Sequence, residues 1–189
     1  MKVLVAYATR HGATRGIAER VAHRLEENGL QVALQPVHEV RAPETYDAFV
    51  IGAAAYYFHW MGEATRFVRR FAPLLGSRPV WLFSSGPLGT DAVDAQGHDV
   101  RATSEPREFA ELAPLIHPRG RSIFFGAYDP NAAPIGLMER LTRMMPAARN
   151  ALPAGDFRDW AEIDAWADGI ARELTGAEAP AVRQPPARR

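Results

Sequence analysis

The chain lacks cysteine altogether. Disulfides, thiolate nucleophiles, cysteine-based zinc sites and iron–sulfur clusters held by cysteine are therefore excluded. If the protein performs redox chemistry, a bound cofactor must supply it. The six histidines show no ligand spacing such as H-x-x-x-H, so we do not expect a structural metal.

An excess of charge of one sign is also missing. The chain carries 22 basic and 22 acidic side chains, and Lys2 is its only lysine. A chain without net charge has no overall field to attract polyanions. Nucleic acid is therefore not an expected partner.

Long hydrophobic runs are absent as well. The longest apolar run, residues 49–58, is about half of the ~20 residues that a membrane-spanning helix needs. Met1 and Lys2 lead directly into an apolar stretch rather than into a signal peptide. We therefore expect a cytoplasmic protein whose contact with a membrane, if any, is peripheral.

The most informative stretch is the first twenty-one residues. Residues 3–7 are mostly apolar without alternation, which is typical of a strand buried on both faces of a sheet. A short loop follows, in which Gly12 permits a tight turn, and a helix begins near Ala13 with its unpaired N–H groups facing the loop. Such a loop is suited to an anion, and the expected anion is a phosphate. The predicted phosphate site consists of Thr9, Arg10, His11, Gly12, Ala13 and Thr14.

A simpler interpretation stays open both for this loop and for Arg10. The loop is also compatible with an ordinary strand-to-helix turn in which a threonine caps the helix. Arg10 either neutralises part of the phosphate charge or points into solvent, since backbone donors and the helix terminus can suffice.

Strands and helices alternate along the rest of the chain. Such alternation predicts an α/β fold, a doubly wound parallel sheet of five strands with helices on both faces. We expect one domain over residues 1–175 and a disordered tail, rich in Pro, Ala and Arg, over residues 176–189. The expected strands are 3–7, 30–34, 48–52, 79–83 and 122–128, and the expected helices are 13–28, 62–75, 104–117, 134–145 and 159–174.

The first loop resembles the FMN-phosphate signature of the flavodoxin family. The matching pattern is Tyr7-x-Thr9-x-x-Gly12-x-Thr14, followed by Ala18 and Val21 on one helix face. Neither the dinucleotide pattern G-x-G-x-x-G nor a Walker loop is present. The resemblance implies a flavodoxin-like sheet with strand order 2-1-3-4-5 and FMN between the first and third strands, a placement taken from flavodoxins rather than derived from these residues.

Residues 1–175 resemble one branch of that family, the menaquinone-dependent protoporphyrinogen oxidases. The motifs that carry this likeness are Thr9-Arg10-x-Gly12-x-Thr14, Gly52-Ala53 with Tyr57 and His59, Phe124-x-Gly126-Ala127, and Asp159-Trp160. The resemblance implies an FMN-dependent oxidoreductase that passes electrons to a quinone, with a porphyrinogen or another small reduced molecule as substrate. Because a flavin performs its own hydride and electron chemistry, no catalytic side chain is expected.

Two further loops are expected to wall the flavin. After the third strand, Ala54 and Ala55 are small enough for close approach, and Tyr56 or Tyr57 would stack on the isoalloxazine ring. The alternative is an aromatic cluster buried beneath a loop. After the fourth strand, backbone donors of Ser85, Gly86, Leu88 and Gly89 would face the flavin carbonyls, although Gly-Pro and Leu-Gly are also ordinary turn signals. His59 is either a proton relay or a bystander.

One segment departs from the oxidases. Their loop after the fourth strand tends to be basic, whereas residues 90–103 carry three Asp and one Arg here. Propionate groups of a porphyrinogen would find little attraction there, which leaves the substrate open. The helix at residues 134–145 either docks on a membrane to meet a quinone or packs in the core.

Two other classes of function remain as alternatives. A flavodoxin-type electron carrier would dock to a redox partner protein and have no small-molecule substrate of its own. A scaffold that had lost its flavin would bury Tyr56 and Tyr57 in its core.

Overall fold

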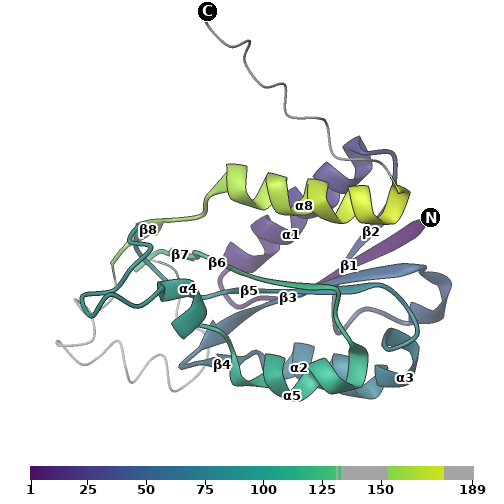
Figure 1. The fold of residues 1–189 in the computed structure, drawn as a ribbon, viewed down its shortest axis with the longest axis horizontal. Coiled ribbons are helices and arrows are strands. Elements are labelled where there is room, and N and C mark those ends of the chain that lie inside the picture. Colours follow the sequence, from purple (N-terminus) through teal and green to yellow (C-terminus); the bar gives the residue numbers. More distant parts are fainter. Residues whose placement is uncertain (131, 133–152, 177–189) are drawn as a thin grey trace, which may run out of the picture.

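The structure, a computed structural model, describes residues 1–130, 132 and 153–176. Its centre is a parallel sheet with strand order β2-β1-β3-β5-β6, and the short strand β4 folds back antiparallel onto β3 (Figure 1). With β4 set aside, this is the predicted order 2-1-3-4-5, which is therefore confirmed. The strands are β1 (Lys2–Ala8), β2 (Gln31–Pro36), β3 (Ala48–Tyr56), β4 (His59–Trp60), β5 (Val80–Ser85) and β6 (Gly120–Phe124).

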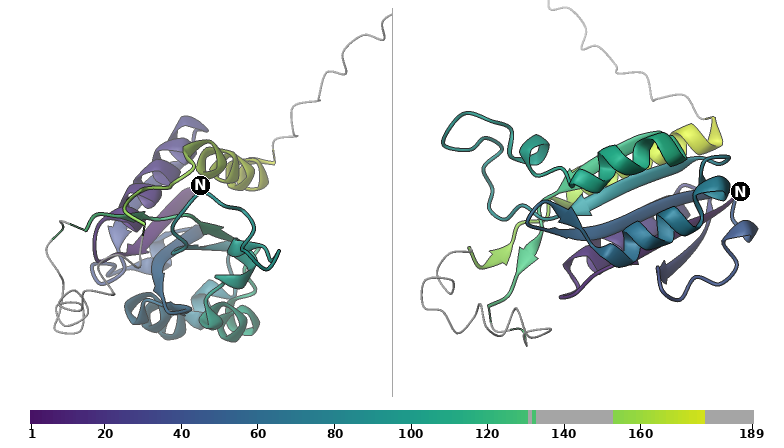
Figure 2. Two further views of the ribbon diagram at one scale, coloured as in Figure 1. Left: turned by 90° about the vertical axis from the view of Figure 1, so that its left-hand side faces the viewer. Right: turned by 90° about the horizontal axis from the view of Figure 1, so that it is seen from below.

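Helices cover both faces of the sheet, as predicted. Val3 and Val5 of β1 lie in a buried cluster with α1 and α8, whereas Leu4 and Ala6 lie in a second cluster with α2, α3 and α5. Figures 1 and 2 show the three layers, with α1 and α8 side by side on one face. The helices are α1 (Ala13–Glu27), α2 (Gly62–Arg70), α3 (Ala72–Leu75), α4 (Val100–Thr103), α5 (Arg107–Ile116) and α8 (Trp160–Thr175), and η1 (Pro43–Thr45) is a 3-10 turn.

The central strands are buried because helices lie on both sides of them, which explains why their sequences do not alternate. The packing at Gly52 is the tightest example. A Cβ at this position would lie 1.9 Å from a ring carbon of Phe83 on the neighbouring strand β5. A glycine is therefore needed here to let the aromatic ring lie over β3.

Two predicted strand ends were wrong by four residues, whereas the other strand boundaries differ by one or two residues at most. The third strand continues to Tyr56, because Ala53 pairs with Ala8 of β1 and Ala54 pairs with Ser85 of β5. The predicted fifth strand is divided: β6 ends at Phe124, and β7 (Ala127–Tyr128) pairs with β8 (Gly155–Asp156) in a separate two-stranded sheet. The residues expected to form an aromatic loop therefore belong largely to a hairpin.

The helix boundaries differ at three places. The predicted helix over 62–75 breaks at Phe71, since Pro73 cannot donate the hydrogen bond that would continue it. The predicted loop over 90–103 contains α4, whose cap is the Asp99 carboxylate. The next helix, α5, begins after Pro106 rather than at the expected cap Ser104.

Ion pairs tie α8 to α1. Arg20 donates from Nε and Nη2 to the two carboxylate oxygens of Asp164, both at 2.6 Å. Arg24 contacts Asp168 at 2.7 Å. The hydrogen bonds from these arginines, which outweigh partial burial, hold the pKa of both carboxyl groups below the ordinary range. The last helix, predicted from residue 159, is thus fixed over the first.

Two predictions fall outside the described residues, namely the helix at 134–145 and the disordered tail at 176–189 beyond its first residue, Gly176. Within the described ranges, no helix has the length and apolar character needed to span a membrane.

Candidate functional site

The predicted phosphate loop connects β1 to α1 at the carboxyl end of the sheet. Gly12 occupies the cap position of α1 with φ 86°, a left-handed conformation that favours glycine. Its N–H donates to Thr9 Oγ1 at 3.1 Å, which curls the loop on itself. Nothing lies within 4 Å of the point where a Cβ of Gly12 would be, so the loop is open on that side.

The start of α1 is electrostatically suited to an anion. No side chain of the described residues caps the helix, and its first turn contains no Asp or Glu. Among the described residues, therefore, no side chain neutralises the unpaired N–H groups and the positive end of the helix dipole. A phosphate group fits this uncapped terminus, which is the arrangement that anion sites of this kind use.

The residues of the predicted phosphate loop differ in their exposure to solvent. Arg10, His11 and Gly12 are exposed, Thr9 and Ala13 are half-buried, and Thr14 is fully buried. The Oγ1 of Thr14 lies 2.7 Å from Oγ of Ser85 at the end of β5. The structure thus brings two predicted site residues together beneath the loop.

Tyr57 and Phe58 form the two-residue turn of the β3–β4 hairpin. Both have left-handed backbones, with φ of 52° and 64°. Turns with two positive φ angles strongly prefer Asn-Gly, so bulky residues here are strained. The side chains are nevertheless 87% and 52% exposed. Strain held at an exposed aromatic pair is typical of a functional site rather than of packing.

The turn is held in place by the beginning of α5. The Glu108 carboxylate accepts the N–H of Trp60 at 2.9 Å and lies 2.9 Å from His59 Nδ1, and the N–H of Arg107 donates to the carbonyl of Phe58 at 3.1 Å. Burial alone would raise the pKa of Glu108, but these hydrogen bonds lower it below its usual value. His59 therefore anchors the turn through Glu108.

The four aromatic residues of this segment have different surroundings. Trp60 is buried, donates to the carbonyl of Phe83 at 3.3 Å and packs edge-on against Phe109. Tyr56 is 37% exposed and lies beneath the guanidinium of Arg10, 4.9 Å from its ring centre. The Arg10 contact places the aromatic turn directly beside the phosphate loop.

The third predicted loop lies along the ends of β3 and β6. A Cβ at Gly86 would lie 3.5 Å from that of Ala55, and the N–H of Gly126 donates to the carbonyl of Pro87 at 2.9 Å. Leu88 packs near Gly126, and both Leu88 and Gly89 are partly exposed. Ala54 is buried within β3. All three predicted loops thus meet at one end of the sheet.

Sequence reasoning missed two residues of this region. Glu108 gave no signal beyond its place near a helix start, and Arg158 was passed over although it precedes the Asp159-Trp160 motif. Arg158 donates from Nη1 to the carbonyl of Ala13 at 3.2 Å, inside the phosphate loop.

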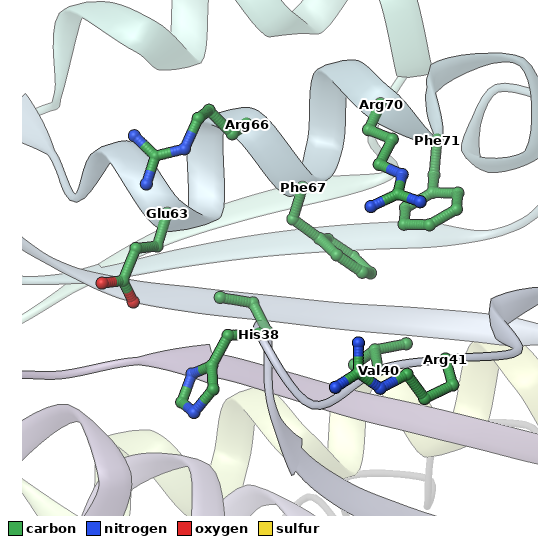
Figure 3. Close-up of a pocket in the computed structure, with 9 residues that line it drawn as sticks. His38, Val40, Arg41, Glu63, Arg66, Phe67, Arg70 and Phe71 are labelled. Carbon is green, nitrogen blue, oxygen red and sulfur yellow. The ribbon is translucent and has the colours of Figure 1, made fainter.

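A groove lies on the other face of the sheet from α1, between α2 and the segment that follows β2 (Figure 3). It has a volume of about 420 Å³, and Phe67 forms part of its apolar lining. Its rim carries Arg41, Arg66 and Arg70 with one acidic side chain, Glu63. None of these arginines forms an ion pair with any of the described residues. The groove is therefore positively charged.

Comparison with known proteins adds a curated relative. Protoporphyrinogen IX dehydrogenase (quinone) of Escherichia coli is 40% identical over 86 residues, which are 44% of this chain and 48% of that protein. The chain thus spans about half the length of the curated relatives it matches.

Solved structures share the fold. An archaeal flavodoxin matches with a TM-score of 0.56 and 16% identity, covering 93% of this chain and 99% of that one. Flavodoxin 2 of Bacillus cereus matches with a TM-score of 0.58 and 18% identity, covering 92% and 99%. The sequence matches the flavodoxin domain over residues 4–140. The chain therefore belongs to the flavodoxin domain family, whose cofactor is FMN.

Proposed function

We propose that this chain is an FMN-dependent oxidoreductase that delivers electrons to a quinone, as the name of its Escherichia coli relative suggests. FMN, when bound, supplies the hydride and single-electron chemistry. The chain's own residues hold the phosphate at the start of α1 and present an aromatic surface beside it. We further propose that Thr9 to Thr14, the hairpin residues Ala54 to Tyr57, and Ser85 to Gly89 form the cofactor site.

The observation that carries this proposal is the exposed Tyr57-Phe58 turn. It lies at the same end of the sheet as the phosphate loop, and Arg10 links the two through its contact with Tyr56. A large apolar surface kept in water at the cost of backbone strain is suited to a flat, apolar reactant such as a quinone. An aromatic cluster that served only packing would be buried.

The acidic charge of residues 90–99 affects which reduced substrate the site would accept. Residues 90–99 project beyond the end of the sheet (Figures 1 and 2) and carry three Asp. Arg101, which lies in the helix that follows this segment, is bound to Glu162 at 2.6 Å. This balance favours a reduced substrate with fewer carboxylates than a porphyrinogen.

Turnover with a quinone tests the proposal. The purified protein, loaded with FMN and reduced without oxygen, should be reoxidised by a menaquinone analogue, and steady turnover should follow when a reductant is supplied. Reoxidation by oxygen or by a partner protein, with none by the quinone analogue, would contradict it.

A second candidate, an electron carrier that docks to a redox protein, draws support from the positively charged groove (Figure 3). Arginines that have no carboxylate partner in the described part of the chain, and that lie beside apolar side chains, would suit an acidic partner. Replacing Arg66 and Arg70 by Glu should then slow reduction by a partner reductase while leaving FMN binding unchanged. Equal rates for the variant and the wild type would exclude this docking face.

A further inference from the structure

Arg158 lies against the first turn of α1, at the predicted phosphate loop. Its Nη1 donates to the carbonyl of Ala13 at 3.2 Å. The same nitrogen would lie 2.4 Å from a Cβ placed on Gly16, so a side chain at this position would push the guanidinium away from the helix. The side chain reaches the loop from a segment 145 positions further along the chain.

Three contacts fix the position of this guanidinium. Asp156 accepts from Nε at 2.7 Å and from Nη2 at 2.5 Å, and the indole ring of Trp160 lies beneath the charge at 4.5 Å. The side chain of Arg158 is only 16% exposed. Asp156 is itself held in β8 by its pairing with Ala127 of β7. The guanidinium is therefore preorganised and cannot swing freely as a surface arginine would.

The charge of Arg158 is offset in part by the Asp156 carboxylate, although it lies beside the start of a helix. The amino end of a helix carries partial positive charge, and cations there are normally disfavoured. The first turn of α1 contains no Asp or Glu, so the helix itself offers Arg158 no acidic partner. A guanidinium has five N–H groups, of which three donate to acceptors among the described residues. Two N–H groups of Arg158 thus stay available beside the loop.

We propose that Arg158 is a positioning residue that makes this site select phosphorylated flavin. It fixes the loop through the carbonyl of Ala13 and adds positive charge where the phosphate dianion binds. The inference rests on the proposed placement of the FMN phosphate at this loop. It predicts that Arg158 affects the affinity for FMN but not the affinity for riboflavin, which has no phosphate.

Flavin titration of the full chain tests this role. Arg158→Gln removes the charge at similar size, and it should raise the dissociation constant for FMN about tenfold or more, the change expected on losing an interaction with a charged group. The dissociation constant for riboflavin should not change. Arg158→Lys, which keeps the charge, should recover part of the affinity for FMN.

Arg119→Gln is a matched control, because Arg119 also lies over a tryptophan ring, that of Trp81, but at the amino end of the sheet. It should leave both dissociation constants unchanged. Circular dichroism establishes that each variant is folded. If Arg158→Gln raises the dissociation constants for FMN and riboflavin by the same factor, or changes neither of them, this inference alone is overturned. If the wild type binds FMN no more tightly than riboflavin, the inference and the proposed phosphate site both fail.

Discussion

Replacing Tyr57 by Gly should stabilise the cofactor-free protein while weakening FMN binding. Tyr57 has φ 52° and is 87% exposed, so the substitution relieves backbone strain and removes little buried surface. The left-handed conformation costs roughly 1–2 kcal/mol for a non-glycine residue. Glycine gives back about 0.5–1 kcal/mol through its greater freedom in the unfolded chain. The net gain is therefore about 0 to 1.5 kcal/mol.

Loss of the tyrosine ring has the opposite effect on the cofactor. A stacked aromatic pair contributes about 0.5–1.5 kcal/mol, which corresponds to roughly a two- to tenfold rise in the dissociation constant of FMN. Urea unfolding of the cofactor-free protein measures the first quantity, and flavin fluorescence titration measures the second.

Tyr57→Phe is the matched control, since it keeps both the ring and the strained backbone. It should leave stability and FMN affinity close to those of the wild type. The reasoning is refuted if Tyr57→Gly destabilises the cofactor-free protein, because the turn would then depend on the ring. An unchanged FMN affinity would remove Tyr57 from the cofactor site.

Two further predictions concern the fold. The hydrogen bond from Arg20 is the main reason why the pKa of Asp164 lies below the ordinary value of 3.8. The stabilising contribution of Asp164 is therefore complete above pH 3.8 and is lost as the pH falls through the lowered pKa. Asp164→Asn should be less stable than the wild type at neutral pH, and acid titration followed by circular dichroism should show this difference in stability disappear. Gly52→Ala would place a Cβ 1.9 Å from a ring carbon of Phe83 and should destabilise by about 1–3 kcal/mol, whereas an unchanged urea midpoint would contradict the packing described.

The fold could be predicted because its signals are local. Unalternating apolar strands and amphipathic helices recur along the chain, and these patterns depend on neighbouring residues only. The end of β3 could not be predicted in this way. Ala53 and Ala54 are small, and nothing nearby indicates that they pair with β1 and β5 on either side. Pairing between distant segments, rather than propensity, extends that strand.

The site shows the same division. Thr9, Gly12 and Thr14 stand close together in the sequence, and the structure places them in one loop at the start of a helix. Arg158 contacts the same loop from 145 positions away, so no pattern within the loop itself could indicate it. The strain at Tyr57 was also hidden, because it arises from a hairpin that β4 closes onto β3. Contacts of this kind require the folded chain.

The comparison of FMN with riboflavin in the wild-type protein tests the central claim most directly. If the uncapped start of α1 binds the phosphate, FMN should bind about a hundredfold more tightly or better, since hydrogen bonds to a charged group contribute roughly 1.5–3 kcal/mol each. Equal dissociation constants for the two flavins, measured by fluorescence titration, would contradict the account.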